Sequence, residues 1–476
     1  MGTLYWSIVS LLLGGCIGSF LNVVIYRWPR GLSLRKPARS FCPACGQTIA
    51  WYDNIPVISY LVLRGRCRRC GVPISLQYPI VELATALTFL MAYDVFFVAH
   101  LRIGIGNEPV DAVMLIAHWI LLAGLIALTV MDLEAYMVDI RVTWLVSLAG
   151  VVGHIFWTPA GSQGWIRPGA AQAGVVLAAA VGLGLGMWWA FRGQPPASLE
   201  EDMTIDGYPS AGLPPSLPVK RSWRWLWLVI PVGLIFAYLA SLACWPGTTF
   251  HLKLPGISPE DGSWQWRAVA ISGPTARVLG GFALLFVGLT LAASRPVAEV
   301  DTQIMESIES EAPDARRMAL WELKLIAPAI LLGALALLLL ESQPAARESL
   351  ERLLGWRVWD DWRPALGFST GLAGWIIGGA VGWLARILFT LLFGKEALGM
   401  GDVHILAAAG AVAGWPVAFL GFFLGAMLAL AGLVVIRLRR QSQALPYGPW
   451  LGLGFFLAVM FQDRILEYLN LRWWFE

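Results

Sequence analysis

Long apolar stretches alternate with shorter polar ones along most of the 476-residue chain. A helix needs roughly 20 apolar residues to cross the hydrocarbon core of a bilayer, and most of these stretches approach that length. The pattern predicts an all-α polytopic membrane protein with about twelve membrane-spanning helices, over residues 4–26, 79–100, 112–131, 141–158, 170–191, 225–244, 275–294, 320–340, 367–393, 403–414, 416–437 and 448–463. The short span over 403–414 is expected to end at Gly-Trp-Pro, residues 414–416, which is typical of a turn.

The composition agrees with this class and excludes a water-soluble one. Hydrophobic residues make up 58% of the chain and charged residues only 14%, whereas a soluble domain carries about 25% charged residues. The first apolar stretch follows no basic residue and contains no small-residue cleavage site. It therefore predicts an uncleaved first helix rather than a removed signal peptide.

The Lys and Arg residues predict the orientation in the membrane. Residues 27–80 hold nine of them against a single acid, Asp53, and short loops rich in Lys and Arg stay on the cytoplasmic side. The N-terminus is therefore expected outside. Each predicted span takes the chain to the other side of the membrane, so the segments 132–140 and 394–402 are also expected on the cytoplasmic side. The basic run "RLRR" at 437–440 falls on the same side and agrees with this orientation.

Four of the six cysteines form two C-x2-C pairs, "CPAC" at 42–45 and "CRRC" at 67–70. Each pair can place two thiolates on one tight turn, and two such turns complete a tetrahedral zinc site. Two disulfides are a poorer interpretation, because thiols stay reduced in the cytoplasm. The sequence predicts a structural zinc ion that folds a small cytoplasmic loop domain, bound by Cys42, Cys45, Cys67 and Cys70.

The loop arginines and the two remaining cysteines have simple explanations. The arginines of the loop could suggest nucleic-acid binding, but the loop is tethered between two helices and the orientation already explains its charge. No nucleic-acid partner is therefore expected. Cys16 and Cys244 lie in apolar stretches and are expected to be small buried hydrophobic residues.

Two aspartates are expected at the same depth of the membrane. Asp132 ends the third span and Asp402 opens the tenth, so both lie at cytoplasmic helix ends, although 270 positions separate them. An ionisable residue at such a place is a candidate functional residue. Two adjacent carboxyl groups share one proton, so one can accept a proton from water while the other donates one to a peptide oxyanion. Gly399 and Gly401 are expected to support the site by allowing unusual dihedrals and close approach of a substrate.

Structural explanations compete with this interpretation. Asp402 directly precedes a helical run and could serve as its N-cap. Asp132 has less structural justification, because the helix dipole disfavours a negative charge at a C-terminus. Glu134 and Asp139 are alternatives for its role, or solvated loop acids. Asp94, His118 and His154 lie in apolar spans and are expected to be hydrogen-bonded within the bundle. Glu322 and Lys324 stand near a helix end and are expected to extend to the membrane interface.

With these residues in view, the chain resembles the bacterial type IV prepilin peptidases, a family of bifunctional leader peptidases and N-methyltransferases. The G-x-G-D motif is shared more widely among intramembrane aspartic proteases. Four blocks carry the resemblance: "GSFLNVVIYRWPRGLS" at 18–33, the cysteine loop "CPACGQTIAWYDNIPVISYLVLRGRCRRCGVPISLQYPIVEL" at 42–83, "MDLEAY" at 131–136, and "GKEALGMGDVHILAAAGAVAGW" at 394–415 with "LPYGPWLGLG" at 445–454.

The resemblance implies an activity. Such a protein cuts the basic leader from prepilins or pseudopilins at the cytoplasmic face of the bacterial inner membrane, in a pilus or secretion pathway. It then methylates the new N-terminus with S-adenosylmethionine. The resemblance maps the catalytic aspartates onto Asp132 and Asp402 and the zinc ligands onto the four cysteines. It associates methyl transfer with the cytoplasmic loop without assigning a cofactor-binding residue.

Three positions depart from the family pattern. Asp139 stands one place early and lacks the usual preceding proline. His404 stands where the family has Lys, and it could titrate near neutral pH as a supporting residue. Gln77 stands where the family favours Arg. Two other functions therefore remain as alternatives: a peptidase without methyltransferase activity, and a non-catalytic membrane scaffold that uses its zinc loop to bind a partner.

The resemblance also divides the chain into parts. It covers residues 1–158 and about 367–463, and the stretch between them is expected to be an insertion of about four helices. The expected parts are a first helix at 1–26, the zinc loop at 27–78, a membrane core with the first aspartate at 79–158, the insertion at 159–366 and a second membrane core at 367–476.

Overall fold

A computed structural model describes thirteen segments of the chain. They are residues 2–36, 39–102, 104–106, 108–135, 137–157, 169–192, 229–244, 249–257, 264–293, 314–358, 362–396, 398–439 and 447–469.

Each of the predicted spans coincides with a helix. The helices are α1 (Gly2–Arg27), α3 (Gln77–Tyr93), α4 (Glu108–Ala135), α5 (Ile140–Phe156), α6 (Ala170–Arg192), α8 (Val229–Cys244), α9 (Gly273–Ala293), α11 (Ala315–Ser342), α13 (Pro364–Phe393), α14 (Met400–Ala413), α15 (Trp415–Arg439) and α16 (Gly448–Tyr468). Eight helices in the described part of the chain are long and apolar enough to cross a membrane, while α5 and α14 are apolar but shorter. The chain is a multi-spanning membrane protein with eight candidate spans, and twelve crossings stay a prediction.

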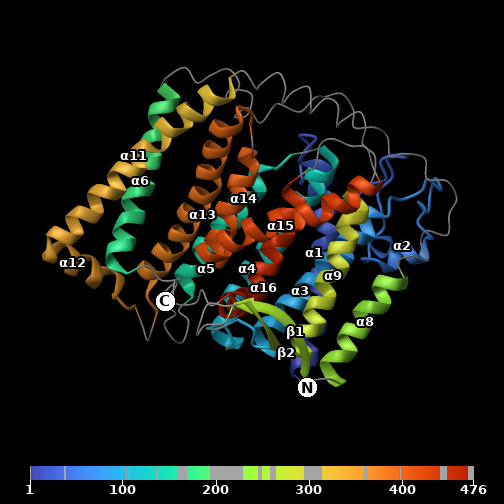
Figure 1. The fold of residues 1–476 in the computed structure, drawn as a ribbon. Coiled ribbons are helices and arrows are strands. Elements are labelled where there is room, and N and C mark those ends of the chain that lie inside the picture. The colour runs from blue at the N-terminus through green and yellow to red at the C-terminus, as the bar shows by residue number, and fades with distance from the viewer. Residues whose placement is uncertain are drawn as a thin grey trace.

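The helices are arranged in three groups. Figure 1 shows α6 and α11 as an outer pair on one side and α8 and α9 on the other, with α4, α5, α13, α14 and α16 between them. The largest fully buried side chains include Leu121 of α4, Leu406 of α14 and Phe455 of α16. In contrast, α11 exposes Leu331 and Leu338, as expected for a helix whose outer face meets lipid tails.

Helix α14 lies at the centre because its small residues let α13 approach closely. A Cβ atom added to Gly374 of α13 would lie 2.0 Å from the carbonyl oxygen of Gly410 in α14. Close packing of small residues is a common way to join helices in membranes, where the hydrophobic effect does not drive their association. The helix ends at the predicted turn, where Gly414 has a φ of 91°.

The structure contains elements that the hydropathy pattern did not predict. Strands β1 (Thr249–Ile257) and β2 (Trp264–Ser272) form an antiparallel pair, and helix α12 (Pro344–Leu354) follows α11. The cysteine loop contains a 3-10 turn, η1 (Trp51–Asp53), and helix α2 (Ile58–Val62), and α3 ends in a π-helical turn, η2 (Asp94–Val98). These elements are too short for a search based on membrane-length apolar stretches.

Buried polar residues in the spans are hydrogen-bonded, as expected. Asp94 accepts hydrogen bonds from Tyr238 of α8 at 2.7 Å and from Nε of Arg277 of α9 at 2.7 Å. Ring nitrogens of His118 and His154 contact the carbonyl oxygens of Met114 and Val412. The Asp94 group therefore ties α8 and α9 to the end of α3.

Two expectations about single residues are wrong. Glu322 does not extend to the interface, because its side chain is only 2% exposed and bonds to residues of α13. Cys16 is exposed on α1 instead of buried, while the side chain of Cys244 lies outside the described residues.

Candidate functional site

The two C-x2-C motifs form two turns of the same construction. In each turn the backbone N–H of the glycine after the second cysteine donates to the carbonyl of the first, Gly46 to Cys42 at 2.8 Å and Gly71 to Cys67 at 3.0 Å. Both glycines have a positive φ, 68° and 71°, which a residue with a Cβ adopts only with strain. The sequence C-x2-C-G therefore fixes each turn.

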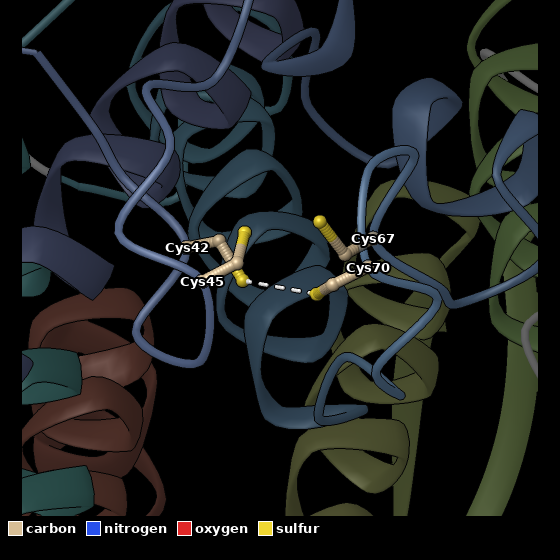
Figure 2. Close-up of side chains that lie close together, drawn as sticks. All are labelled: Cys42, Cys45, Cys67 and Cys70. Carbon is tan, nitrogen blue, oxygen red and sulfur yellow. Dashed lines mark hydrogen bonds between the residues drawn. The ribbon is translucent and has the colours of Figure 1, made fainter.

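The two turns face each other and bring the four thiols together. Figure 2 shows the side chains pointing into the space between the turns, and all four sulfur atoms lie within 4.8 Å of one another. The Sγ atoms of Cys42 and Cys70 are 3.9 Å apart. In a tetrahedral zinc site with Zn–S bonds of about 2.3 Å, the sulfur atoms are about 3.8 Å apart. The cluster could hold a metal ion, and its donor atoms and spacing fit zinc.

The local environment favours a thiolate at Cys67. Backbone N–H groups of Cys70 and Arg69 donate to its sulfur and lower its pKa to about 7. A hydrogen bond from the backbone N–H of Val72 lowers the pKa of Cys70, but desolvation and the neighbouring cysteine sulfur atoms together raise it to about 11. A thiolate is the form that binds metals.

The cysteine loop is attached to the membrane helices through buried polar contacts. At the end of α1, Arg27 is 4% exposed and donates to the carbonyls of Ser33 and Leu34. Near the start of α3, Glu82 accepts a hydrogen bond from the backbone N–H of Val57 at 2.7 Å. The loop is therefore positioned relative to α1 and α3 at the start of the chain.

Asp132 lies in the last turn of α4, with only 7% of its surface exposed. Its carboxylate accepts a hydrogen bond from the backbone N–H of Gly448 at the start of α16. A Cβ atom on Gly448 would lie 2.7 Å from Oδ2 of Asp132. The glycine therefore allows the backbone of α16 to approach the carboxylate.

Asp402 lies in the first turn of α14 and is 8% exposed. The N-cap residue of α14 is Gly399, so the structure does not show the alternative in which Asp402 is the N-cap. Its carboxylate instead accepts a hydrogen bond from the backbone N–H of Gly399, and its charge interacts with that of Asp132. The ends of α4, α14 and α16 thus bring together two buried carboxyl groups that are far apart in sequence.

The alternative acids near Asp132 have other partners. Asp139 caps α5 by accepting a hydrogen bond from the backbone N–H of Arg141 at 2.9 Å, and it forms an ion pair with the Arg141 side chain at 2.6 Å. The carboxylate of Glu134 accepts a hydrogen bond from Gln77 of α3. Asp139 thus has a structural explanation that Asp132 lacks.

Comparison with known proteins finds one family that is similar to part of the chain. The family model "Bacterial Peptidase A24 N-terminal domain" matches residues 12–96. A prepilin leader peptidase/N-methyltransferase of Myxococcus xanthus is 43% identical over 146 residues, which is 31% of this chain and 39% of that protein. The proteins of that name from Vibrio cholerae (42% identical over 127 residues) and Klebsiella pneumoniae (37% over 156) match 25% and 32% of this chain, and 45% and 62% of their own lengths.

Over part of its length the chain is similar to the prepilin leader peptidase/N-methyltransferase family, and residues 12–96 match the A24 N-terminal domain. The chain spans less than two thirds of the length of each of these relatives. No solved structure matches the chain. The match to the family model ends at residue 96, before both aspartates, so the roles of Asp132 and Asp402 stay predictions.

The glycines near Asp402 differ from the expectation that they allow unusual dihedrals. Gly399 has φ of −65°, which any residue adopts, and Gly401 lies within α14. A Cβ atom on Gly401 would lie 2.5 Å from Cβ of Val138, so its lack of a side chain provides space rather than an unusual dihedral. His404 is half-buried on the next turn of α14, and its supporting role stays a prediction.

Sequence reasoning missed two residues near the aspartates, Gly448 at the start of α16 and Tyr447 just before it. Burial and the negative charge of Asp402 raise the pKa of Tyr447, so its hydroxyl stays protonated and donates to the carbonyl of Phe422 at 3.1 Å. Tyr447 and Gly448 stand in the block "LPYGPWLGLG". This block is part of the family resemblance, but nothing in its local pattern indicates that the start of α16 lies beside Asp132.

Proposed function

We propose that this protein is a membrane aspartic endopeptidase. It cleaves the leader of type IV prepilins or pseudopilins at the cytoplasmic side of the bacterial inner membrane, and then methylates the new N-terminus with S-adenosylmethionine. The observation that carries the proposal is the pair of buried aspartates whose charges interact although 270 positions separate them. The similarity over part of the chain supports the same function, because the relatives are named prepilin leader peptidase/N-methyltransferase.

The proposed reaction uses the pair as one unit with a single proton. The ionised carboxyl group takes a proton from water, and the water oxygen bonds to the scissile carbonyl carbon while the other carboxyl group protonates the carbonyl oxygen. The C–N bond then breaks as the amine takes up the proton that water gave. The backbone N–H groups of Gly399 and Gly448 hold the two carboxyl groups in position throughout.

The cysteine cluster has a separate role in this proposal. Four cysteine ligands complete a tetrahedral zinc site and leave no position for a substrate, so the ion stabilises the loop rather than catalysing cleavage. The four sulfur atoms and their spacing support this assignment.

Methyl transfer is the second reaction of the proposal. When bound, S-adenosylmethionine would supply the methyl group, and the new N-terminal amine would be its acceptor. This assignment rests on the names of the relatives, and no residue of the described part of the chain is assigned to the methyl donor.

Asparagine substitutions test the catalytic pair. The side-chain oxygen of Asn can still accept the glycine N–H, so Asp402→Asn and Asp132→Asn should fold at normal abundance. We expect each to lower prepilin cleavage by at least about a thousandfold, measured with purified protein and a prepilin in detergent. Asp139→Asn is the matched control, because it removes an adjacent buried carboxylate that caps α5, and it should keep activity.

The mass of the processed N-terminus separates the proposed function from its alternatives. A cleaved product heavier by one methyl group supports both reactions, whereas an unmodified cleaved product indicates a peptidase alone. Cleavage that survives Asp402→Asn would refute the catalytic pair. A wild-type protein that cleaves no prepilin would favour the scaffold function.

A further inference from the structure

The segment that leads from α13 into α14 is held by a buried arginine of α13. Nε of Arg386 donates to Oε1 of Glu322 at 3.0 Å, and Nη1 donates to the carboxylate of Glu396 and to the carbonyl oxygen of Leu398. Arg386 is 7% exposed and Glu322 2% exposed. Their attraction is therefore screened little by water.

Glu322 belongs to α11, in the stretch that the family resemblance does not cover. It lies on the buried stripe of α11 between Ala319 and Ile326, and the indole N–H of Trp383 donates to its Oε2 at 2.9 Å. One stripe of α11 therefore packs on α13, and the carboxylate of Glu322 is fixed from two directions.

One peptide unit connects Arg386 with Asp402. The carbonyl of Leu398 accepts a hydrogen bond from Arg386, and the N–H of the same peptide bond, which belongs to Gly399, donates to the carboxylate of Asp402. A peptide unit is planar and rigid. A rotation of its carbonyl end therefore moves the N–H that holds Asp402.

We propose that Arg386, fixed by Glu322 of α11, is a positioning residue that sets the place of Asp402 through the Leu398–Gly399 peptide. This inference rests on the proposed aspartic peptidase function. It gives α11 a part in catalysis without contact to the substrate.

A purely structural ion pair is the competing explanation, and the chain provides a matched control. Arg277 of α9 donates to both oxygens of Asp94 in η2, and both side chains are buried. This pair also joins a helix of the uncovered stretch to the rest of the bundle. The pair lies at the C-terminal end of α3. Gln77, which bonds to Glu134 near Asp132, lies at the N-terminal end of the same helix, so the control pair is at the end of α3 away from Asp132.

The experiment compares Arg386→Lys and Glu322→Gln with Arg277→Lys in the full-length protein. Lysine keeps the positive charge but loses the planar fork of donors. We expect kcat for prepilin cleavage to fall at least about tenfold in the first two variants, with KM within about twofold, because a small misplacement of a catalytic group reduces chemistry more than binding. Arg277→Lys should keep kcat at equal amounts of folded protein.

Amide hydrogen exchange of residues 398–402 provides a readout that does not need activity. Faster exchange of the Gly399 amide in Arg386→Lys and Glu322→Gln, but not in Arg277→Lys, supports the inference together with the fall in kcat. Unchanged exchange overturns it, and so does faster exchange with normal kcat. If the wild-type protein cleaves no prepilin, the proposed function fails, and exchange alone decides whether Arg386 holds this peptide.

Discussion

Gly448 provides a sensitive test of the aspartate site, because it touches Asp132 without carrying a reactive group. A Cβ atom at this position would lie 2.7 Å from Oδ2 and 3.3 Å from Cγ of Asp132, whereas ordinary contact begins at 3.4 Å. In Gly448→Ala the carboxylate must therefore move by about 0.7 Å, or the start of α16 must move away from it.

The expected effect is on activity rather than on folding. Gly448 is the first residue of α16 and its φ is not positive, so alanine can adopt its backbone conformation. The atom that the new methyl group meets is the end of a side chain that can rotate. A displacement of about 1 Å at a catalytic group costs on the order of a hundredfold in rate. We therefore expect kcat for prepilin cleavage to fall between about tenfold and a hundredfold, at normal abundance and thermal stability.

Gly452→Ala is the matched control for this prediction. The residue lies one turn further along α16, where a Cβ atom would meet Oγ1 of Thr129 in α4 at 3.0 Å. It introduces the same methyl group between the same two helices without touching Asp132, so kcat should change little. Full activity of Gly448→Ala in a well-folded protein would show that the carboxylate of Asp132 is not the group whose position matters.

Two further predictions concern the metal and the membrane bundle. Purified protein should contain one zinc ion per chain, and Cys45→Ser should lose it and expose the loop to protease. Because protons compete for thiolates, and the pKa of Cys67 is about 7, a chelator should remove zinc faster at pH about 6 than at pH about 8. Asp94→Asn leaves Arg277 buried without its counter-charge, and should lower the free energy of unfolding in detergent by about 3 kcal/mol. The exposed pair of Arg347 and Glu351 is the control, and Glu351→Gln should cost less than about 0.5 kcal/mol.

The positions of the long helices could be predicted because the length of an apolar stretch is a local property of the sequence. The two cysteine turns could be predicted for the same reason, since each motif is contained within five residues. The strand pair β1–β2 and helix α12 were missed, because their patterns are short and carry no membrane-length signal.

Contacts between distant parts of the chain could not be predicted in this way. Glu322 was expected at the interface because it stands near a helix end, but its partner Arg386 is 64 positions further along. The glycines beside Asp402 were expected to allow unusual dihedrals, whereas Gly401 provides space for Val138. Which side chain needs that space depends on packing, and a single sequence does not contain that information.

The shortness of α14 affects how water reaches the aspartates. Its 14 residues give a rise of about 21 Å, while the hydrocarbon core is about 30 Å thick. This helix cannot span an undistorted bilayer, so the lipid must thin around it or the surrounding helices must admit a water-filled recess to one of its ends. If the proposed function is correct, hydrolysis of the peptide bond would take place in such a hydrated region beside α14.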